Sequence, residues 1–161
     1  MEMAQISLAK GLKLKNRLVG RLTRLNQDIQ RSNSLLQEQR ESCTPEAFRV
    51  LLGTQTELRE ALIALKATIY RANQEIQEDI IRKDELKSLA QFYTSLNTMD
   101  GVVRHDFQNT EVRYVAIVKK PEADENLKKL ESEIDAIQDR LDEYNNTTKI
   151  SVPRRVLDLA S

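Results

Sequence analysis

The side chains that could do chemistry in this chain are mainly carboxylates and arginines. Acidic pairs three or four residues apart would lie on one face of a helix, as in all-α nucleotide hydrolases that bind Mg²⁺ through such pairs. In a chain with 25 acidic residues these spacings arise freely, and no second motif completes a site, so a solvated helix face explains them. The pairs are Glu122 with Glu125, Glu75 with Asp79, and Glu131 with Asp135.

Other catalytic sets are excluded by residue counts. His105 is the only histidine, and metal-binding bundles of the ferritin type need Glu-x-x-His pairs on two facing helices. His105 therefore reads as a surface residue. Cys43 is the only cysteine, so it forms no disulfide within the chain, and its surroundings do not mark it as a nucleophile. With no Gly-rich phosphate loop either, the sequence predicts no cofactor, no metal site and no catalytic residues.

Charge is balanced overall but unevenly placed. The chain has 25 basic and 25 acidic residues; residues 10–24 hold six basic and no acidic residues, and residues 122–143 hold nine acidic and three basic ones. The basic segment could bind nucleic acid or another phosphate-rich partner. Alternatively it lies beside the acidic helix of the same protein or of its oligomer, which we favour because the opposite charge is already present. Nucleic acid is thus an unfavoured partner.

A membrane is not an expected partner either. No stretch approaches the ~18 consecutive apolar residues of a membrane helix, and the first 14 residues are too polar for a signal peptide. We therefore expect a cytoplasmic protein.

Composition and periodicity predict a mainly all-α fold, an antiparallel long-helix bundle or coiled-coil hairpin. Charged residues are 31% and aromatic ones 4%, with few glycines and prolines. Helices are expected at about 5–40 and 45–73, where apolar residues alternate at spacings of four and three. Thr44 is the expected cap of the second helix, and Gly11 and Gly20 mark weak points or close helix approach in the first. The two seams are Leu18, Leu22, Leu25, Ile29, Ser32 and Leu36, and Phe48, Leu51, Gln55, Leu58, Leu62, Leu65, Ile69, Ala72 and Ile76.

The rest of the chain holds two more helices and one β-hairpin. Residues 73–79 are polar apart from Ile76, so the chain either turns there, with Asp79 capping a helix over about 79–97, or continues as one long helix; we favour the turn. Residues 102–118 are rich in β-branched and aromatic residues and predict a small β-hairpin insertion that packs on the bundle or pairs with another subunit. A last helix spans about 121–145, with an apolar seam of Leu127, Leu130, Ile134, Ile137, Leu141 and Tyr144. A single domain is expected over residues 1–150, and a tail over 151–161 that is disordered or docks on a neighbouring subunit.

Four short segments resemble, in their order, a family of small bacterial helical proteins often labelled "septicolysin". They are IYRAN at 69–73, IRKDELK at 81–87, EVRYV at 111–115 and NTT at 146–148. The resemblance covers roughly residues 8–150, although a Gly-containing loop usual after the position of Asn73 is replaced here by residues 74–78. It implies the helical fold but little about function. We discount the cytolysin label, because no segment could satisfy its backbone inside a bilayer.

An up–down topology would bring several polar residues of these segments to one end of the bundle. They could form a small anion-binding pocket, with the arginines as ligands. Alternatively they cap helix ends and fix the turns, which we favour. The candidate polar cluster is Arg71, Asn73, Arg82, Asp84, Asn146, Thr147 and Thr148.

The leading functional hypothesis is therefore a non-enzymatic structural or interaction protein that forms a homo-oligomer through its helix seams. The alternatives are a small enzyme or ligand-binding protein that uses the polar cluster, with an unknown small-molecule ligand, and a nucleic-acid-binding protein that uses the basic first helix. The substrate, partner and oligomer number are not encoded in any motif of the sequence.

Overall fold

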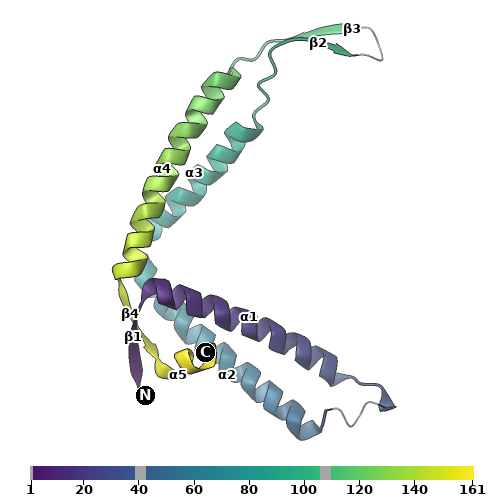
Figure 1. Cartoon of the computed structure of the whole chain (residues 1–161), viewed down its shortest axis with the longest axis vertical. Coiled ribbons are helices and arrows are strands. Elements are labelled where there is room, and N and C mark those ends of the chain that lie inside the picture. The colour runs from purple at the N-terminus through teal and green to yellow at the C-terminus, as the bar shows by residue number, and fades with distance from the viewer. Residues whose placement is uncertain (1, 39–42, 106–109) are drawn as a thin grey trace. The chain divides into compact units, whose positions relative to one another are not determined.

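The structure, a computed structural model, describes residues 2–38, 43–105 and 110–161, apart from the side chains of residues 104, 105 and 110. It is mainly helical with a small β-hairpin, which confirms the predicted fold class (Figure 1). The sequence predicted one domain over residues 1–150. The chain instead divides into two compact units, one of Met1–Glu75 with Asp142–Ser161 and one of Ile76–Leu141, and each is described by itself.

Two long helices form the body of the first unit. α1 (Leu8–Asn33) and α2 (Pro45–Asn73) lie side by side as the predicted αα-hairpin (Figure 1). The middle of each predicted seam is buried, with Leu18, Leu58 and Leu65 at 0–1% exposure, whereas Leu36 at the end of the first seam is 69% exposed. Thr44 caps α2 as expected, accepting a hydrogen bond from the Ala47 amide at 3.2 Å. The prediction of a first helix over 5–40 was too long at both ends.

The start of the chain forms a strand where a helix was predicted. β1 (Met3–Ser7) pairs antiparallel with β4 (Lys149–Pro153), in a register that places Ile6 opposite Ile150. Ser7 then caps α1 by accepting a hydrogen bond from the Lys10 amide at 3.2 Å. The hairpin was the only β-structure predicted, so this second sheet corrects that prediction. Its strands lie about 145 residues apart in the sequence, a long-range pairing that local periodicity does not reveal.

The predicted tail is part of the core of the first unit. Ile150 and Val152 are buried on β4, while Lys149 and Ser151, which alternate with them, are exposed, as in a strand with one covered face. α5 (Arg154–Ala160) follows and buries Val156 against α1 and α2. The tail is thus neither disordered nor in need of a neighbouring subunit to dock on.

Polar contacts fix α5 on the two long helices. The Arg21 guanidinium donates to the Leu159 carbonyl at 3.0 Å, and Arg155 forms an ion pair with Glu57 of α2 at 2.7 Å. Arg154 forms a further ion pair with Glu2 beside β1. Both chain ends are therefore held by side chains from the rest of the unit.

Only one of the two glycines of α1 lies at a close approach. A Cβ atom on Gly11 would come within 2.6 Å of Ile150 Cδ1, whereas a Cβ atom on Gly20 would meet nothing within 4 Å. Gly11 lets β4 cross close to α1, so the close approach is that of a strand and not of the helix that the sequence suggested. Gly20 marks no close approach, which leaves only the alternative of a weak point in the helix.

The second unit begins where the polar segment interrupts the helix. A 3₁₀ turn, η2 (Gln74–Ile76), lies between α2 and α3 (Gln77–Ser95), so this segment forms neither one unbroken α-helix nor a non-helical turn. The predicted hairpin is confirmed as β2 (Gly101–His105) and β3 (Thr110–Tyr114); residues 106–109 of the predicted hairpin lie outside the described residues. α4 (Lys120–Thr147) begins in this unit and ends in the first one.

The second unit has little core of its own. Among its described residues only Ala123, Ile137 and Leu141 are buried apolar side chains, all on α4, and α3 has none. The other α4 seam residues, Leu127, Leu130 and Ile134, are only half-buried. Similar apolar periodicity thus gives a closed core in the first unit and an open helix pair in the second.

We expect Ile150→Ala to destabilise the first unit. Removing a buried isoleucine costs about 2–5 kcal/mol of unfolding free energy, whereas Ser151→Ala, on the exposed face of the same strand, should change it by less than about 0.5 kcal/mol. Urea unfolding followed by circular dichroism at 222 nm measures both. Equal stability of the two variants would show that β4 is not part of the core.

Candidate functional site

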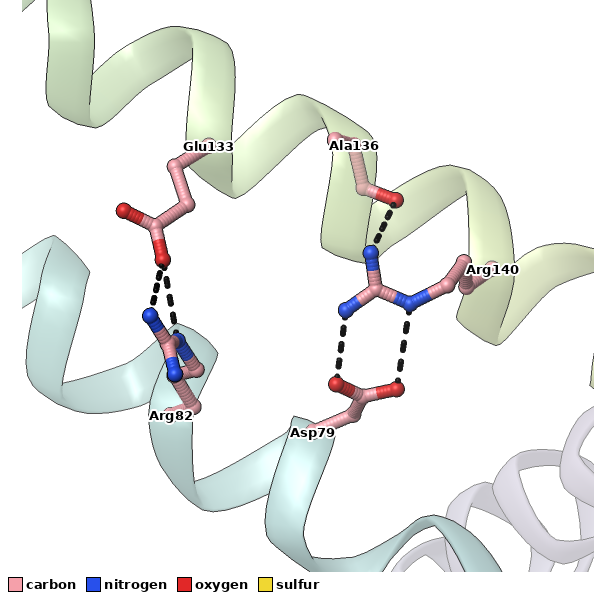
Figure 2. A network of polar contacts seen from close by, with 5 residues as sticks. All are labelled: Asp79, Arg82, Glu133, Ala136 and Arg140. Carbon is pink, nitrogen blue, oxygen red and sulfur yellow. Dashed lines mark hydrogen bonds and ion pairs between the residues drawn. The ribbon is translucent and has the colours of Figure 1, made fainter.

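Two ion pairs connect α3 and α4 (Figure 2). The Arg140 guanidinium donates to both carboxylate oxygens of Asp79, at 2.7 and 3.3 Å. One turn along α3, the Arg82 guanidinium donates twice to Glu133 Oε1, at 2.6 and 2.9 Å. Each helix contributes one arginine and one carboxylate, so the charges of the four residues cancel within the pair of helices.

The ion pair of Asp79 with Arg140 is the less exposed of the two, and it shifts the pKa of both its groups. The hydrogen bonds from Arg140 lower the pKa of the Asp79 carboxyl below its ordinary value of 3.8, against a smaller opposing effect of burial. The same contact raises the pKa of Arg140. Both groups therefore stay charged at neutral pH, and the Asp79 side chain, which was predicted to cap α3, is instead occupied by Arg140. The cap position itself falls on Ile76, which makes no side-chain capping bond.

A cavity of about 380 Å³ lies among these residues. The Arg140 guanidinium also donates to the Ala136 carbonyl of its own helix at 3.4 Å, which holds its side chain along α4 (Figure 2). Because both arginines already face carboxylates, an entering anion would have to break an ion pair. The cavity is lined by Glu78, Asp79, Arg82, Glu133, Ala136, Ile137 and Arg140.

A second polar centre lies in the first unit, around Tyr144 near the end of α4. Its hydroxyl lies 2.8 Å from the Ala72 carbonyl and 3.1 Å from Glu75 Oε2, so one proton is placed between two acceptors. Burial raises the pKa of this phenol, and the nearby Glu75 carboxylate acts in the same direction, whereas a hydrogen bond with Thr148 opposes them. Tyr144 thereby joins the ends of α2 and α4.

The seven residues of the predicted polar cluster are divided between the two units. Arg82 and Asp84 are in the second, where Arg82 pairs with Glu133 and the Asp84 carbonyl accepts a hydrogen bond from the Ser88 hydroxyl at 3.2 Å. The other five lie at the ends of α2 and α4 in the first unit: Arg71, Asn73, Asn146, Thr147 and Thr148.

Of those five residues, Thr147 and Thr148 form hydrogen bonds at the end of α4, and Asn73 has a buried side-chain oxygen. The Thr147 hydroxyl donates to the Glu143 carbonyl of its own helix at 2.8 Å. The Thr148 amide bonds to the Tyr144 carbonyl and its carbonyl accepts from the Leu8 amide, each at 2.9 Å, so Thr148 joins the end of α4 to the start of α1. Asn73 Oδ1 is buried without a donor among the described residues. Arg71 is exposed.

Sequence reasoning missed the residues that carry these contacts. Asp79 was predicted as a cap, Tyr144 as part of an apolar seam, and Glu133 and Arg140 only as members of an acidic segment. Tyr144 had one available signal, since it is the only residue of an otherwise aliphatic seam with a polar group. Pairing of Asp79 with Arg140, 61 residues away, has no local signal.

Comparisons with protein-family models, with curated proteins and with solved structures find no match. The resemblance to septicolysin-labelled proteins therefore stays a prediction. Across residues 2–38, 43–105 and 110–161, no group of three or more acidic, histidine or cysteine side chains is arranged to hold a metal ion. In the same part of the chain, every helix is too short or too polar to cross a membrane.

Tyr144→Phe should lower the unfolding free energy by about 0.5–1.5 kcal/mol at neutral pH, because the phenol hydrogen bond is lost. The raised pKa adds a pH dependence. Above the ordinary value of 10.0 the unfolded phenol ionises before the folded one, so the contribution is present below pH 10 and is lost as the pH rises through the folded pKa. Urea unfolding at several pH values should therefore show the two proteins converging above pH 10; a constant difference would contradict this.

Carboxyl NMR titration should give Asp79 a pKa below 3.8. Arg140→Gln should raise that pKa, because it removes the hydrogen bonds that stabilise the carboxylate. Lys129→Gln is a matched control, since Lys129 pairs with Glu125 and not with Asp79. An unchanged Asp79 pKa in Arg140→Gln would show that the ion pair does not form in solution. The stability that the pair contributes should be present above pH 3.8 and be lost as the pH falls through the lowered pKa.

Proposed function

We propose that this protein is a non-enzymatic structural protein that assembles with further copies of itself through the apolar surface of its second unit. The observation that carries the proposal is the uneven distribution of apolar side chains. Of the eighteen buried apolar residues of the described chain, fifteen are in the first unit and three in the second.

The exposed apolar side chains show the opposite distribution. The second unit is the smaller of the two but carries nine of the sixteen large apolar residues that are exposed in the described chain. Ile117 is 97% exposed, and Val115 is 77% exposed. The nine are Ile81, Leu89, Phe92, Met99, Val102, Val112, Tyr114, Val115 and Ile117.

Many of these residues lie in one region, where α3 ends and two connectors reach the hairpin. The connectors are residues 96–100, between α3 and β2, and residues 115–119, between β3 and α4. A groove of about 350 Å³ there is lined mainly by apolar side chains of both connectors. Exposed apolar surface of this extent in a soluble chain is typical of a protein–protein contact. The lining residues are Leu96, Asn97, Met99, Tyr114, Val115, Ala116, Ile117 and Val118.

The free energies of burial and association favour a contact made by several apolar side chains over a contact made by one. Burying a fully exposed Val, Leu, Ile or Phe side chain contributes about 1.5–3 kcal/mol, while association costs on the order of 4–15 kcal/mol in lost freedom. One or two side chains could not hold two copies together. A surface to which each copy contributes several apolar side chains could.

The polar centres support a structural role. The arginines between α3 and α4 are paired with carboxylates, and Tyr144 and Thr148 link helix ends. These contacts fix the helices relative to one another within each unit. The exposed apolar side chains of the second unit have no comparable structural role inside the described chain. We therefore propose that the residues of the candidate polar cluster fix helix ends and turns and do not form an anion-binding pocket.

Sedimentation-velocity ultracentrifugation at micromolar concentration should show self-association of the full chain. Ile117→Ser should weaken it, because that side chain contributes exposed apolar area on the second unit. Ile63→Ser is the matched control: Ile63 is also exposed, at 59%, but lies on α2 in the first unit. A strictly monomeric wild-type protein would refute the proposal, as would equal effects of the two substitutions.

A further inference from the structure

Six basic side chains form one line along α1, on the surface of the first unit. Successive members are three, four or seven residues apart, so they fall within a narrow arc of the helix. All six are exposed. At 1.5 Å per residue the line is about 30 Å long. We call it the basic stripe, and its members are Lys10, Lys13, Arg17, Arg21, Arg24 and Arg31.

The chain does not neutralise the basic stripe. Within the described residues none of the six cations forms an ion pair, and only Arg21 has a side-chain hydrogen bond, to the Leu159 carbonyl. α1 packs on α2, α5, β1 and β4, whereas the acidic segment 122–143 belongs almost entirely to the second unit. The acidic helix, which we favoured as the partner of the basic segment, therefore makes no ion pair with it inside the described chain.

The two units differ in net charge, although the whole chain is neutral. The first unit holds 15 basic and 11 acidic residues, and the second holds 10 basic and 14 acidic ones. Asp28 is the only acidic residue in the sequence of α1, where it lies between Arg24 and Arg31. A polyanion that approaches α1 therefore meets a local excess of positive charge that the balanced total conceals.

The basic stripe is densest beside the end of α5. Arg17, Arg21 and Arg24 line a groove of about 350 Å³ there, together with Gly20 and Ala160. Gly20 leaves this place open, since a Cβ atom on it would meet nothing within 4 Å. The bond from Arg21 to the Leu159 carbonyl, at 3.0 Å, fixes one guanidinium against α5. Because guanidinium groups bind phosphate oxygens through paired hydrogen bonds, the groove suits a phosphate group.

The shape of the basic stripe favours a partner with regularly repeated phosphates. One strand of B-DNA carries a phosphate every 3.4 Å along the duplex axis, so a line of about 30 Å spans roughly nine of them. A single strand would be held by stacking of its bases on aromatic rings, and α1 has no aromatic residue. A membrane-surface helix would need an exposed apolar face. In α1, which is described along its whole length, Val19 is the only large apolar side chain that is exposed.

We propose that the basic stripe binds the phosphate backbone of double-stranded DNA, independently of the base sequence. Arg17, Arg21 and Arg24 contact phosphates at the groove, and the other three cations extend the contact along α1 in both directions. The inference goes beyond the proposed self-assembly and does not depend on it, because the stripe is in the first unit and the exposed apolar surface is in the second.

Salt dependence tests the number of phosphate contacts. Fluorescence anisotropy of a labelled 30-base-pair DNA duplex measures the affinity of the full chain. With six contacts the affinity should fall about a thousandfold between 50 and 200 mM salt. The double variant Arg17→Gln with Arg24→Gln keeps four contacts, so it should bind more weakly at 50 mM salt and lose only about a hundredfold over the same range. The matched control is Lys87→Gln with Lys128→Gln, which removes two exposed charges from the second unit and should behave as the wild type.

A substitution that strengthens binding provides a test that misfolding cannot imitate. Asp28→Asn removes the carboxylate from the line of cations and should raise the affinity for the duplex several-fold, because it no longer repels the phosphates. Asp84→Asn is the matched control, since it makes the same change at an exposed position on α3 in the second unit. Circular dichroism at 222 nm checks that every variant keeps its helices.

Each other outcome overturns the inference. Absence of duplex binding at 50 mM salt refutes it, as do equal effects of Asp28→Asn and Asp84→Asn. Tighter binding to duplex RNA, or to vesicles that contain phosphatidylserine, than to duplex DNA would assign the basic stripe to that partner instead. If DNA does not bind and the Arg17→Gln, Arg24→Gln variant loses self-association in the ultracentrifuge, the stripe is covered by the acidic helix of another copy.

Discussion

The burial of the chain ends against α1 and α2 is the interaction on which the first unit depends. Two helices alone cover only the seam between them, and the remaining apolar residues need another layer. β4 and α5 supply it, with Val152 at 0% and Val156 at 1% exposure. β1 pairs with β4 along one edge, and Gly11 provides the room that Ile150 needs beside α1. The polar contacts at the end of α4, through Tyr144 and Thr148, are then held in place by this closed core.

The described part of the second unit has no such covering layer over its two helices, so many of their apolar side chains remain exposed. α3 has apolar residues on more than one side, so α4 can cover only part of them, and Ile81 and Phe92 are each 54% exposed. The ion pairs of Asp79 with Arg140 and of Arg82 with Glu133 connect the helices beside Ile137, one of the three buried apolar side chains of this unit. Exposed ion pairs of this kind contribute little stability individually but fix the geometry when both partners are held on helices.

The difference between the units gives the assembly proposal its physical basis. A surface that the chain itself does not cover can be covered by another copy. The closed unit and the open unit would then have different tasks, with the first supplying stability and the second supplying contacts.

The sequence by itself determined the helical class, the seams of α1 and α2, the Thr44 cap and the hairpin, because each depends on residues within a few turns of one another. Leu58, Leu62 and Leu65 indicate the buried face of α2 through their spacing alone. The polar cluster was only partly predicted: Thr148 does join helix ends, but the partner of Arg82 and the roles of Asp79 and Tyr144 were missed. Those contacts link residues 51 to 72 positions apart.

Only the tertiary structure decided that the chain has two units and that its ends form a sheet. Residues 3–7 read as the start of a helix and residues 151–161 as a tail, since neither segment has a partner nearby in the sequence. Strand pairing satisfies backbone groups between distant segments, and the burial of Val152 depends on surfaces built by α1 and α2. Local periodicity records which side chains must be buried, but which segments cover them is set by the packing of the whole chain.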